Sequence, residues 1–308
     1  MEGKPMTGRK SRFSLDSLLD GAQLPALPQS AIRLLQLSQD PENGPAEFAA
    51  PIETDPGLTG QVLKFVNSSY FGFSREISSV KLAITLVGIR TIKNFSLWSA
   101  VFSLMPNPKC GPFDLKCLWQ DSLRRGLFSR AVGHSVGQAD SEDLFAAALL
   151  QDMAIPLLAK ELPEEYNKLF HARRGGKVRL SEVEHERFGW NHAQAAAKLA
   201  CGWSLPEEFA ALIEHHAAYE DIQRAGGTHG QLTIALSALL PSAQDATWFE
   251  HDQFVEAYHE LTGGSMSDLM TLLAAIDESF GEFAPVLKLG MPERSLVECL
   301  RSDEATVM

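Results

Sequence analysis

Apolar residues recur at three- and four-residue intervals through most of the chain, the spacing of one face of an α-helix. The pattern is clearest in residues 31–38, 58–66 and 119–132. No segment alternates apolar and polar positions over a strand's length, and no Asn-Gly hairpin signal interrupts the helical spacing. The pattern therefore predicts an all-α fold.

Capping residues mark several helix ends. Asp55 precedes a proline and Ser79 precedes an apolar run, so each is expected to cap a helix with its side-chain oxygen. Ser181 and Glu184 have the S-x-x-E spacing of a capping box, which predicts a helix that begins there and continues to about Ala200.

Proline-rich segments suggest how the helices are grouped. Residues 106–112 contain three prolines and a glycine, and Pro241 marks a second, weaker break. We expect four parts: a disordered leader (1–13), a helical N-terminal lobe (14–105), a helical middle lobe (113–240) and a C-terminal helical extension (241–308).

Composition narrows the class of protein. The 308 residues are 45% hydrophobic and 21% charged, as in globular proteins, and the net charge of −12 disfavours binding to nucleic acids and anionic membranes. The four cysteines form no CxxC pair, and the basic N-terminus is not followed by an apolar stretch. No apolar run approaches the ~20 residues that span a bilayer. These features predict a cytoplasmic protein.

A series of short motifs resembles the HDOD (HD-related output domain) family, a branch of the HD-type metal phosphohydrolases. The N-terminal motifs are Leu24-Pro25-x-Leu27-Pro28, Ile52-x-x-Asp55-Pro56, Asn67-Ser68, Ile77-x-Ser79 and Ala83-Ile84-x-x-x-Gly88. The later motifs are Trp119-x-x-Ser122, Ala148-x-Leu150-x-Asp152, Phe188-Gly189-x-x-His192, Trp203-x-Leu205-Pro206 and His215-His216. The resemblance extends over about residues 20 to 240.

This resemblance implies a helical module of bacterial signal transduction. Its partner would be a sensor kinase, a receiver protein or a cyclic-dinucleotide enzyme, and a homodimer is a further expectation. A fold alone does not establish an activity, so the site residues carry the functional argument.

The resemblance also implies a metal pocket that has lost part of its ligand set. HD enzymes hold divalent metals with His and Asp, and the metal activates a water molecule. The His-Asp position reads Gln151-Asp152 here, and Asp121 stands where an earlier helix might supply a histidine. An amide oxygen is a poor substitute for imidazole as a transition-metal ligand. We therefore expect a vestigial pocket without a bound metal.

Other ligands remain at the expected positions. Asp152, His192 and one of His215 and His216 could form a three-ligand site for iron, manganese or zinc. Neighbouring helical residues point about 100° apart, so only one histidine of the pair should face the pocket. Alternatively, His192 serves only as a donor to a carboxylate or a backbone carbonyl.

A basic cluster stands out in this acidic chain. Arg173, Arg174, Lys177 and Arg179 flank Gly175-Gly176, so an anion or a phosphorylated partner could dock on this loop. The alternative is a solvated loop between helices, which we favour. For Arg124-Arg125 the sequence suggests only solvent exposure.

The replacement of the expected histidine by Gln151 favours a non-catalytic output or adaptor module that acts through protein–protein contacts. The alternatives are a metal-dependent phosphohydrolase or phosphodiesterase acting on a nucleotide, and a regulator that binds cyclic dinucleotides.

Overall fold

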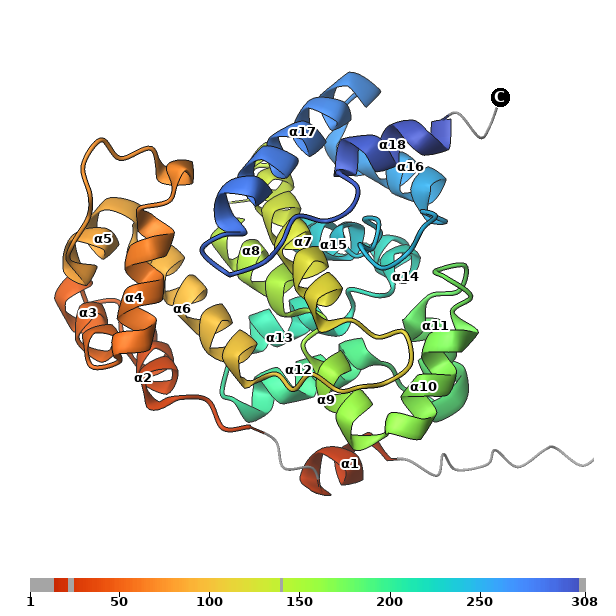
Figure 1. The fold of residues 1–308 in the computed structure, drawn as a ribbon, viewed down its shortest axis with the longest axis horizontal. Coiled ribbons are helices and arrows are strands. Elements are labelled where there is room, and N and C mark those ends of the chain that lie inside the picture. Colours follow the sequence, from red (N-terminus) through yellow and green to blue (C-terminus); the bar gives the residue numbers. More distant parts are fainter. Residues whose placement is uncertain (1–13, 22–24, 139–140, 305–308) are drawn as a thin grey trace, which may run out of the picture.

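The computed structural model describes residues 14–21, 25–138 and 141–304, and these residues form an all-helical molecule (Figure 1). No strand occurs in these three ranges, which confirms the predicted fold class. None of the described helices has the length and apolar character needed to cross a bilayer. The predicted leader, residues 1–13, lies outside the described residues.

The helices of residues 29–104 form a lobe at one side of the molecule, whereas the first helix, residues 15–21, lies apart from this lobe at the bottom of the view (Figure 1). Asp55 and Ser79 cap helices as predicted, because their side chains accept hydrogen bonds from the backbone N–H of Leu58 at 3.0 Å and of Leu82 at 3.3 Å. The elements are α1 (Leu15–Gly21), α2 (Gln29–Leu37), α3 (Pro45–Glu53), α4 (Pro56–Val66), the 3₁₀ turn η1 (Ser69–Phe71), α5 (Val80–Val87) and α6 (Ile89–Leu104).

Helix α7 packs against α8, α15 and α17, and the predicted proline-rich break falls between α6 and α7. The last long helix, α17, packs along α7, so the C-terminal segment adds to the same hydrophobic core. The boundaries between lobes remain a prediction. The elements are α7 (Leu115–Ser135), α8 (Ser141–Leu150), α9 (Ala154–Glu161), α10 (Pro163–Ala172), α11 (Leu180–Phe188), α12 (His192–Gly202), α13 (Glu207–Glu214), α14 (Tyr219–Arg224), α15 (His229–Ser237), α16 (His251–Thr262), α17 (Met266–Phe283) and α18 (Leu296–Glu304).

The capping box predicted at Ser181 is wrong. The residue that precedes α11 is Arg179, and Glu184 is fully buried in the interior of that helix. The predicted single helix is also broken, because Gly189 takes a left-handed conformation (φ 81°) that ends α11. Asn191 then caps α12 through the N–H groups of the first turn. This break places the first residue of α12 beside the interior of α11.

Helices α7 and α8 approach each other closely because glycines lie at their contact. A Cβ at Gly126 would stand 2.9 Å from Leu149 Cγ and 3.1 Å from Phe145 Cδ2, both on α8. The close contact brings the side chains of α7 near the residues that follow α8.

We expect Gly126→Ala to destabilise the fold by about 1–3 kcal/mol, because overpacking outweighs the improved helix propensity of alanine. Gly60→Ala is the matched control, since Gly60 is an exposed residue of α4 with no atom within 4 Å of its added Cβ. That control should gain about 0.5–1 kcal/mol. Urea unfolding of both variants measures the difference, and equal stabilisation of both would contradict the close contact.

Candidate metal centre

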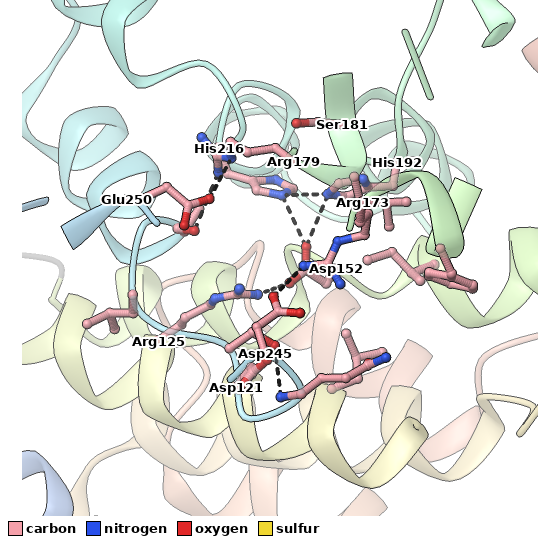
Figure 2. Close-up of a pocket in the computed structure, with 18 of the residues that line it drawn as sticks. Asp121, Arg125, Asp152, Arg173, Arg179, Ser181, His192, His216, Asp245 and Glu250 are labelled. Carbon is pink, nitrogen blue, oxygen red and sulfur yellow. Dashed lines mark hydrogen bonds and ion pairs between the residues drawn. The ribbon is translucent and has the colours of Figure 1, made fainter. Parts of the chain in front are cut away.

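Three predicted ligands converge from different segments of the chain. Asp152 follows the end of α8, His192 is the first residue of α12, and His216 lies just after α13 (Figure 2). The Nε2 atoms of His192 and His216 lie 3.3 and 3.2 Å from Asp152 Oδ1, and 3.3 Å from each other. All three residues are buried. His215 does not join them, since it ends α13 and its side chain is 52% exposed.

Hydrogen bonds on the far side of each ring fix the orientation of the two imidazoles. His192 Nδ1 contacts Glu184 Oε2 at 2.6 Å, and His216 Nδ1 donates to the backbone carbonyl of Ile213 at 2.8 Å. Glu184 also accepts from the backbone N–H of His192 at 2.8 Å and from the Tyr166 hydroxyl at 2.6 Å. Metal-binding histidines are commonly held in this way, with the outer nitrogen bonded to a carboxylate or carbonyl.

The donor set fits one divalent metal ion, although the sequence led us to expect a pocket without one. Metal–nitrogen bonds are about 2.0–2.1 Å long, so two ligand atoms of a tetrahedral site lie about 3.4 Å apart. The three atom pairs here are separated by 3.2–3.3 Å. Two imidazole nitrogens and one carboxylate oxygen are a set that suits zinc, iron or manganese. The same geometry also fits the alternative role of His192 as a donor to a carboxylate, because its Nδ1 contacts Glu184.

Arg125 occupies the second oxygen of Asp152. Its guanidinium forms an ion pair with Asp152 Oδ2, whereas the two histidines face Oδ1 (Figure 2). The expectation that Arg124 and Arg125 are exposed is therefore wrong. Arg124 is buried and forms an ion pair with Asp277 at 3.9 Å, and the Arg125 side chain is 12% exposed.

The two residues that replace expected ligands have separate roles. Gln151 is fully buried, and its Oε1 accepts a 3.4 Å hydrogen bond from Ser237, while its Nε2 has no partner among the described residues. Asp121 accepts 2.7 Å hydrogen bonds from the Ser242 hydroxyl and the Ala243 N–H. Neither belongs to the three-ligand group, although Asp121 lines the adjoining cavity.

A cavity of about 110 Å³ adjoins the ligands, and the basic loop supplies part of its wall. Arg173 pairs with Asp245 at 2.6 Å, and Arg179 lies 3.9 Å from Glu250 (Figure 2). The Nε atoms of Arg125 and Arg173 are buried and have no partner among the described residues. Arg174 and Lys177 are exposed and do not line this cavity. The favoured solvated-loop interpretation is therefore wrong for two of the four cations.

Burial and neighbouring charges set the protonation of the three ligands. Burial opposes ionisation of Asp152, but Arg125 and hydrogen bonds from both histidines outweigh it and hold the pKa of Asp152 well below its usual value. Burial also opposes the charged form of His192, yet Glu184 and Asp152 raise the pKa of His192 to about 9. Burial lowers the pKa of His216 despite its contact with Asp152. A metal ion at this position would replace the His192 proton.

Sequence reasoning missed the residues that support the ligands. Glu184, Tyr166 and Arg125 each act through a ligand rather than as one, so no metal-binding pattern identifies them. The one available signal was the charge of Glu184, because an acid among the buried residues of a helix needs a polar partner. At Glu184 the capping-box spacing offered a different explanation.

Comparison with known proteins identifies relatives of this chain. The HDOD domain family model matches residues 24–219. An uncharacterised protein of Treponema pallidum (strain Nichols) is 24% identical over 194 residues, which are 63% of this chain and 37% of that protein. The chain thus spans little more than a third of the length of this curated relative.

Solved structures share the fold. An HDOD domain protein of unknown function from Geobacter sulfurreducens superposes with a TM-score of 0.70 at 21% identity, covering 90% of this chain and 97% of that one. A protein of Shewanella amazonensis SB2B, provisionally classed as a phosphohydrolase, gives 0.67 at 18% identity, covering 93% and 97%. A protein of Marinobacter aquaeolei VT8, provisionally classed in signal transduction, gives 0.65 at 20% identity, covering 92% and 63%.

Proposed function

Because the chain belongs to the HDOD domain family, we propose that it is a non-catalytic signalling output module that holds one divalent metal ion. This proposal rests on the two carboxylate oxygens of Asp152, which face different kinds of partner. Its Oδ1 faces the two histidines, and its Oδ2 pairs with Arg125. Two-metal hydrolases clamp the attacking and leaving oxygens between two ions. With Oδ2 taken by a guanidinium, Asp152 does not bridge two metals.

The surroundings of the metal site also favour a regulatory role. Gln151 offers no imidazole for a second ion, and both oxygens of Asp121 accept hydrogen bonds from Ser242 and Ala243. The cavity of about 110 Å³ is smaller than the roughly 300–1,000 Å³ of typical small-molecule pockets. This volume does not favour a cyclic dinucleotide as the ligand of the cavity beside the metal site.

In this proposal the metal ion fixes the arrangement of the helices, and the output is a contact with another protein. The partner would be a sensor kinase, a receiver protein or a cyclic-dinucleotide enzyme, with a homodimer as a further form. The fold that the chain shares with a protein provisionally classed in signal transduction supports this role.

The test is a hydrolysis assay on nucleotides, cyclic dinucleotides and a chromogenic phosphodiester, with Mn²⁺, Fe²⁺ or Zn²⁺ added in turn. We expect the wild-type chain and Asp152→Ala to give the same background rate. A turnover that requires Asp152 would overturn the non-catalytic proposal. The size of such a loss is expected to be large, since removing a catalytic metal's ligand removes its activated water.

A second candidate function is a metal-dependent phosphohydrolase, and the arginine-lined cavity favours it. Three protein ligands leave coordination positions open, as in catalytic zinc sites. The unpartnered Nε atoms of Arg125 and Arg173 are donors that a phosphoryl oxygen would satisfy. In that case Arg173→Gln should also lower turnover, whereas Lys177→Gln, on the exposed part of the same loop, should not.

A further inference from the structure

The cavity beside the candidate metal ligands is lined partly by the segment that joins α15 to α16. Residues 238–250 of this segment contain turns and no helix. Asp121 fixes its start by accepting 2.7 Å hydrogen bonds from the Ser242 hydroxyl and from the backbone N–H that follows. Trp248 fixes its end, because it is buried and its Nε1 donates to a backbone carbonyl at 2.7 Å. Residues 244–247, between these two anchors, form the tip of the segment.

The tip carries one ionisable side chain, and that side chain points inward. Asp245 Oδ2 pairs with Arg173 at 2.6 Å, and the Asp245 side chain is only 11% exposed (Figure 2). The other side-chain contacts of the tip involve its uncharged groups. Gln244 donates to a backbone carbonyl of the proline-rich segment, and the Ala246 carbonyl accepts from Arg294 at 2.6 Å. Movement of the tip would therefore affect the segment between α6 and α7 and the residues that precede α18.

The Asp245 carboxylate lies in a seat formed by the loop that follows α10. A Cβ added at Gly176 would stand 2.7 Å from Asp245 Oδ2 and 2.8 Å from its Cγ, so only glycine admits the carboxylate this closely. Gly176 also has a left-handed backbone conformation (φ 98°), which glycine adopts without strain. Arg173, at the start of the same loop, supplies the opposite charge. Arg173 and Gly176 together form a seat for one oxyanion group, which Asp245 occupies.

The charges of the cavity are nearly balanced, so a further anion can bind only where one acid withdraws. Each of the three arginines that line the cavity lies beside one acid. Asp245 is the acid on the tip, whereas the other three acids adjoin an anchor, a helix end or the two histidines. Its withdrawal would leave Arg173 without an acidic partner. The charged and titratable residues that line the cavity are Asp121, Asp152, Asp245, Glu250, Arg125, Arg173, Arg179, His192 and His216.

We propose that the seat of Arg173 and Gly176 binds a free oxyanion of the size of phosphate, and that Asp245 is a latch that this anion displaces. Guanidinium groups bind phosphate oxygens through paired, charge-assisted hydrogen bonds. The buried Nε of Arg173 has no partner among the described residues, so it is a donor that Asp245 leaves unused. This inference rests on the proposed output function, because release of the tip would change the surface that a partner meets.

The size of the cavity favours a small ion over a larger ligand. Its volume is about 110 Å³, whereas one water molecule needs roughly 10–15 Å³ of such space. Pockets for drug-sized ligands have roughly 300–1,000 Å³. The cavity therefore has room for an inorganic oxyanion beside the seat.

The first test is calorimetric titration of the full-length chain with inorganic phosphate. Asp245→Asn removes the competing charge and should raise the affinity for phosphate about tenfold or more, because no charge-assisted pair has to be broken. Arg173→Gln should abolish binding. Asp221→Asn is the matched control, since Asp221 forms an equally short ion pair with Arg224, at 2.6 Å, on the exposed surface outside the cavity. The control should bind phosphate as the wild type does.

The second test is amide hydrogen exchange of the wild-type chain, which does not depend on the folding of a variant. The amides of Gln244 and Asp245 are hydrogen-bonded to Ser242, so they are protected while the tip is closed. Saturating phosphate should accelerate their exchange and leave the amides of α7 unchanged. The inference is overturned if this exchange does not change, or if Asp245→Asn binds phosphate no more tightly than Asp221→Asn.

Two further comparisons identify the ligand and its place. O-phosphoserine carries the same phosphate group on a larger body and should bind more weakly than inorganic phosphate, so equal or tighter binding would contradict a free ion. Phosphate binding that is lost after treatment with chelator but kept in Arg173→Gln would place the anion on the metal and overturn the seat. Asp245 is not a candidate metal ligand, so metal content and the hydrolysis assay report separately on the proposed function.

Discussion

His216→Ala is expected to abolish stoichiometric metal binding, together with the thermal stabilisation that we expect a metal ion to give to the wild-type chain. One candidate ligand of three is lost, and the remaining pair, Asp152 and His192, supplies fewer protein ligands than known zinc sites have. A ligand present at about 1,000 times its Kd adds about 4 kcal/mol to the free energy of unfolding. Elemental analysis of protein purified without chelator and without a histidine tag gives the metal content. Thermal unfolding with and without chelator gives the stabilisation.

The neighbouring residue is the control for this experiment. His215 is adjacent in sequence but largely exposed and outside the ligand group, so His215→Ala should keep both the metal and the chelator-sensitive shift in Tm. The difference with and without chelator is the decisive quantity, because His216→Ala also removes buried packing. A wild-type chain with neither bound metal nor a Tm shift on addition of Mn²⁺, Fe²⁺ or Zn²⁺ would refute the metal site.

Glu184→Ala should be among the most destabilising single substitutions, at about 3–5 kcal/mol. The carboxylate is fully buried and serves Tyr166 as well as two groups of His192. Its removal leaves these three donors unsatisfied in the interior, and each unsatisfied group costs about 1–3 kcal/mol. Denaturant unfolding of the metal-free protein measures the loss without any contribution from a bound ion.

Two further variants show whether the contacts are responsible. Glu186→Ala removes an exposed acid from the same helix and should change stability by less than about 0.5 kcal/mol. Tyr166→Phe removes one of the three hydrogen bonds and should give an intermediate loss. If Glu184→Ala and Glu186→Ala were equally stable, the buried network would have no energetic role.

The sequence was sufficient for much of the fold, because short-range signals decide helix ends. Asp55 and Ser79 act as caps within their own turn, and the all-α class follows from apolar spacing. The three candidate metal ligands could be anticipated only through a resemblance, since Asp152, His192 and His216 are distant in sequence. One histidine of the His215-His216 pair faces the pocket, as expected, but both lie in the turn after α13, so helix geometry is not the reason.

Tertiary contacts explain what the sequence did not reveal. The break at Gly189 depends on this one residue adopting a positive φ. The sequence around it was equally compatible with the continuous helix that we predicted. Arg125 has no partner in its own helix, but it pairs in the folded chain with Asp152, which lies in the turn after α8. Ion pairs between helices depend on which helices pack together, and a local sequence pattern does not specify this.

The separation of the three ligands along the chain has a mechanical consequence. An ion held by Asp152, His192 and His216 ties together the ends of segments 152–192 and 192–216, as a cross-link would. The four cysteines are all free, so no disulfide performs this task. An ionic tie differs from a disulfide because it opens without a reductant, whenever the surrounding concentration of free metal falls. The rigidity of this lobe would then report the supply of metal in its environment.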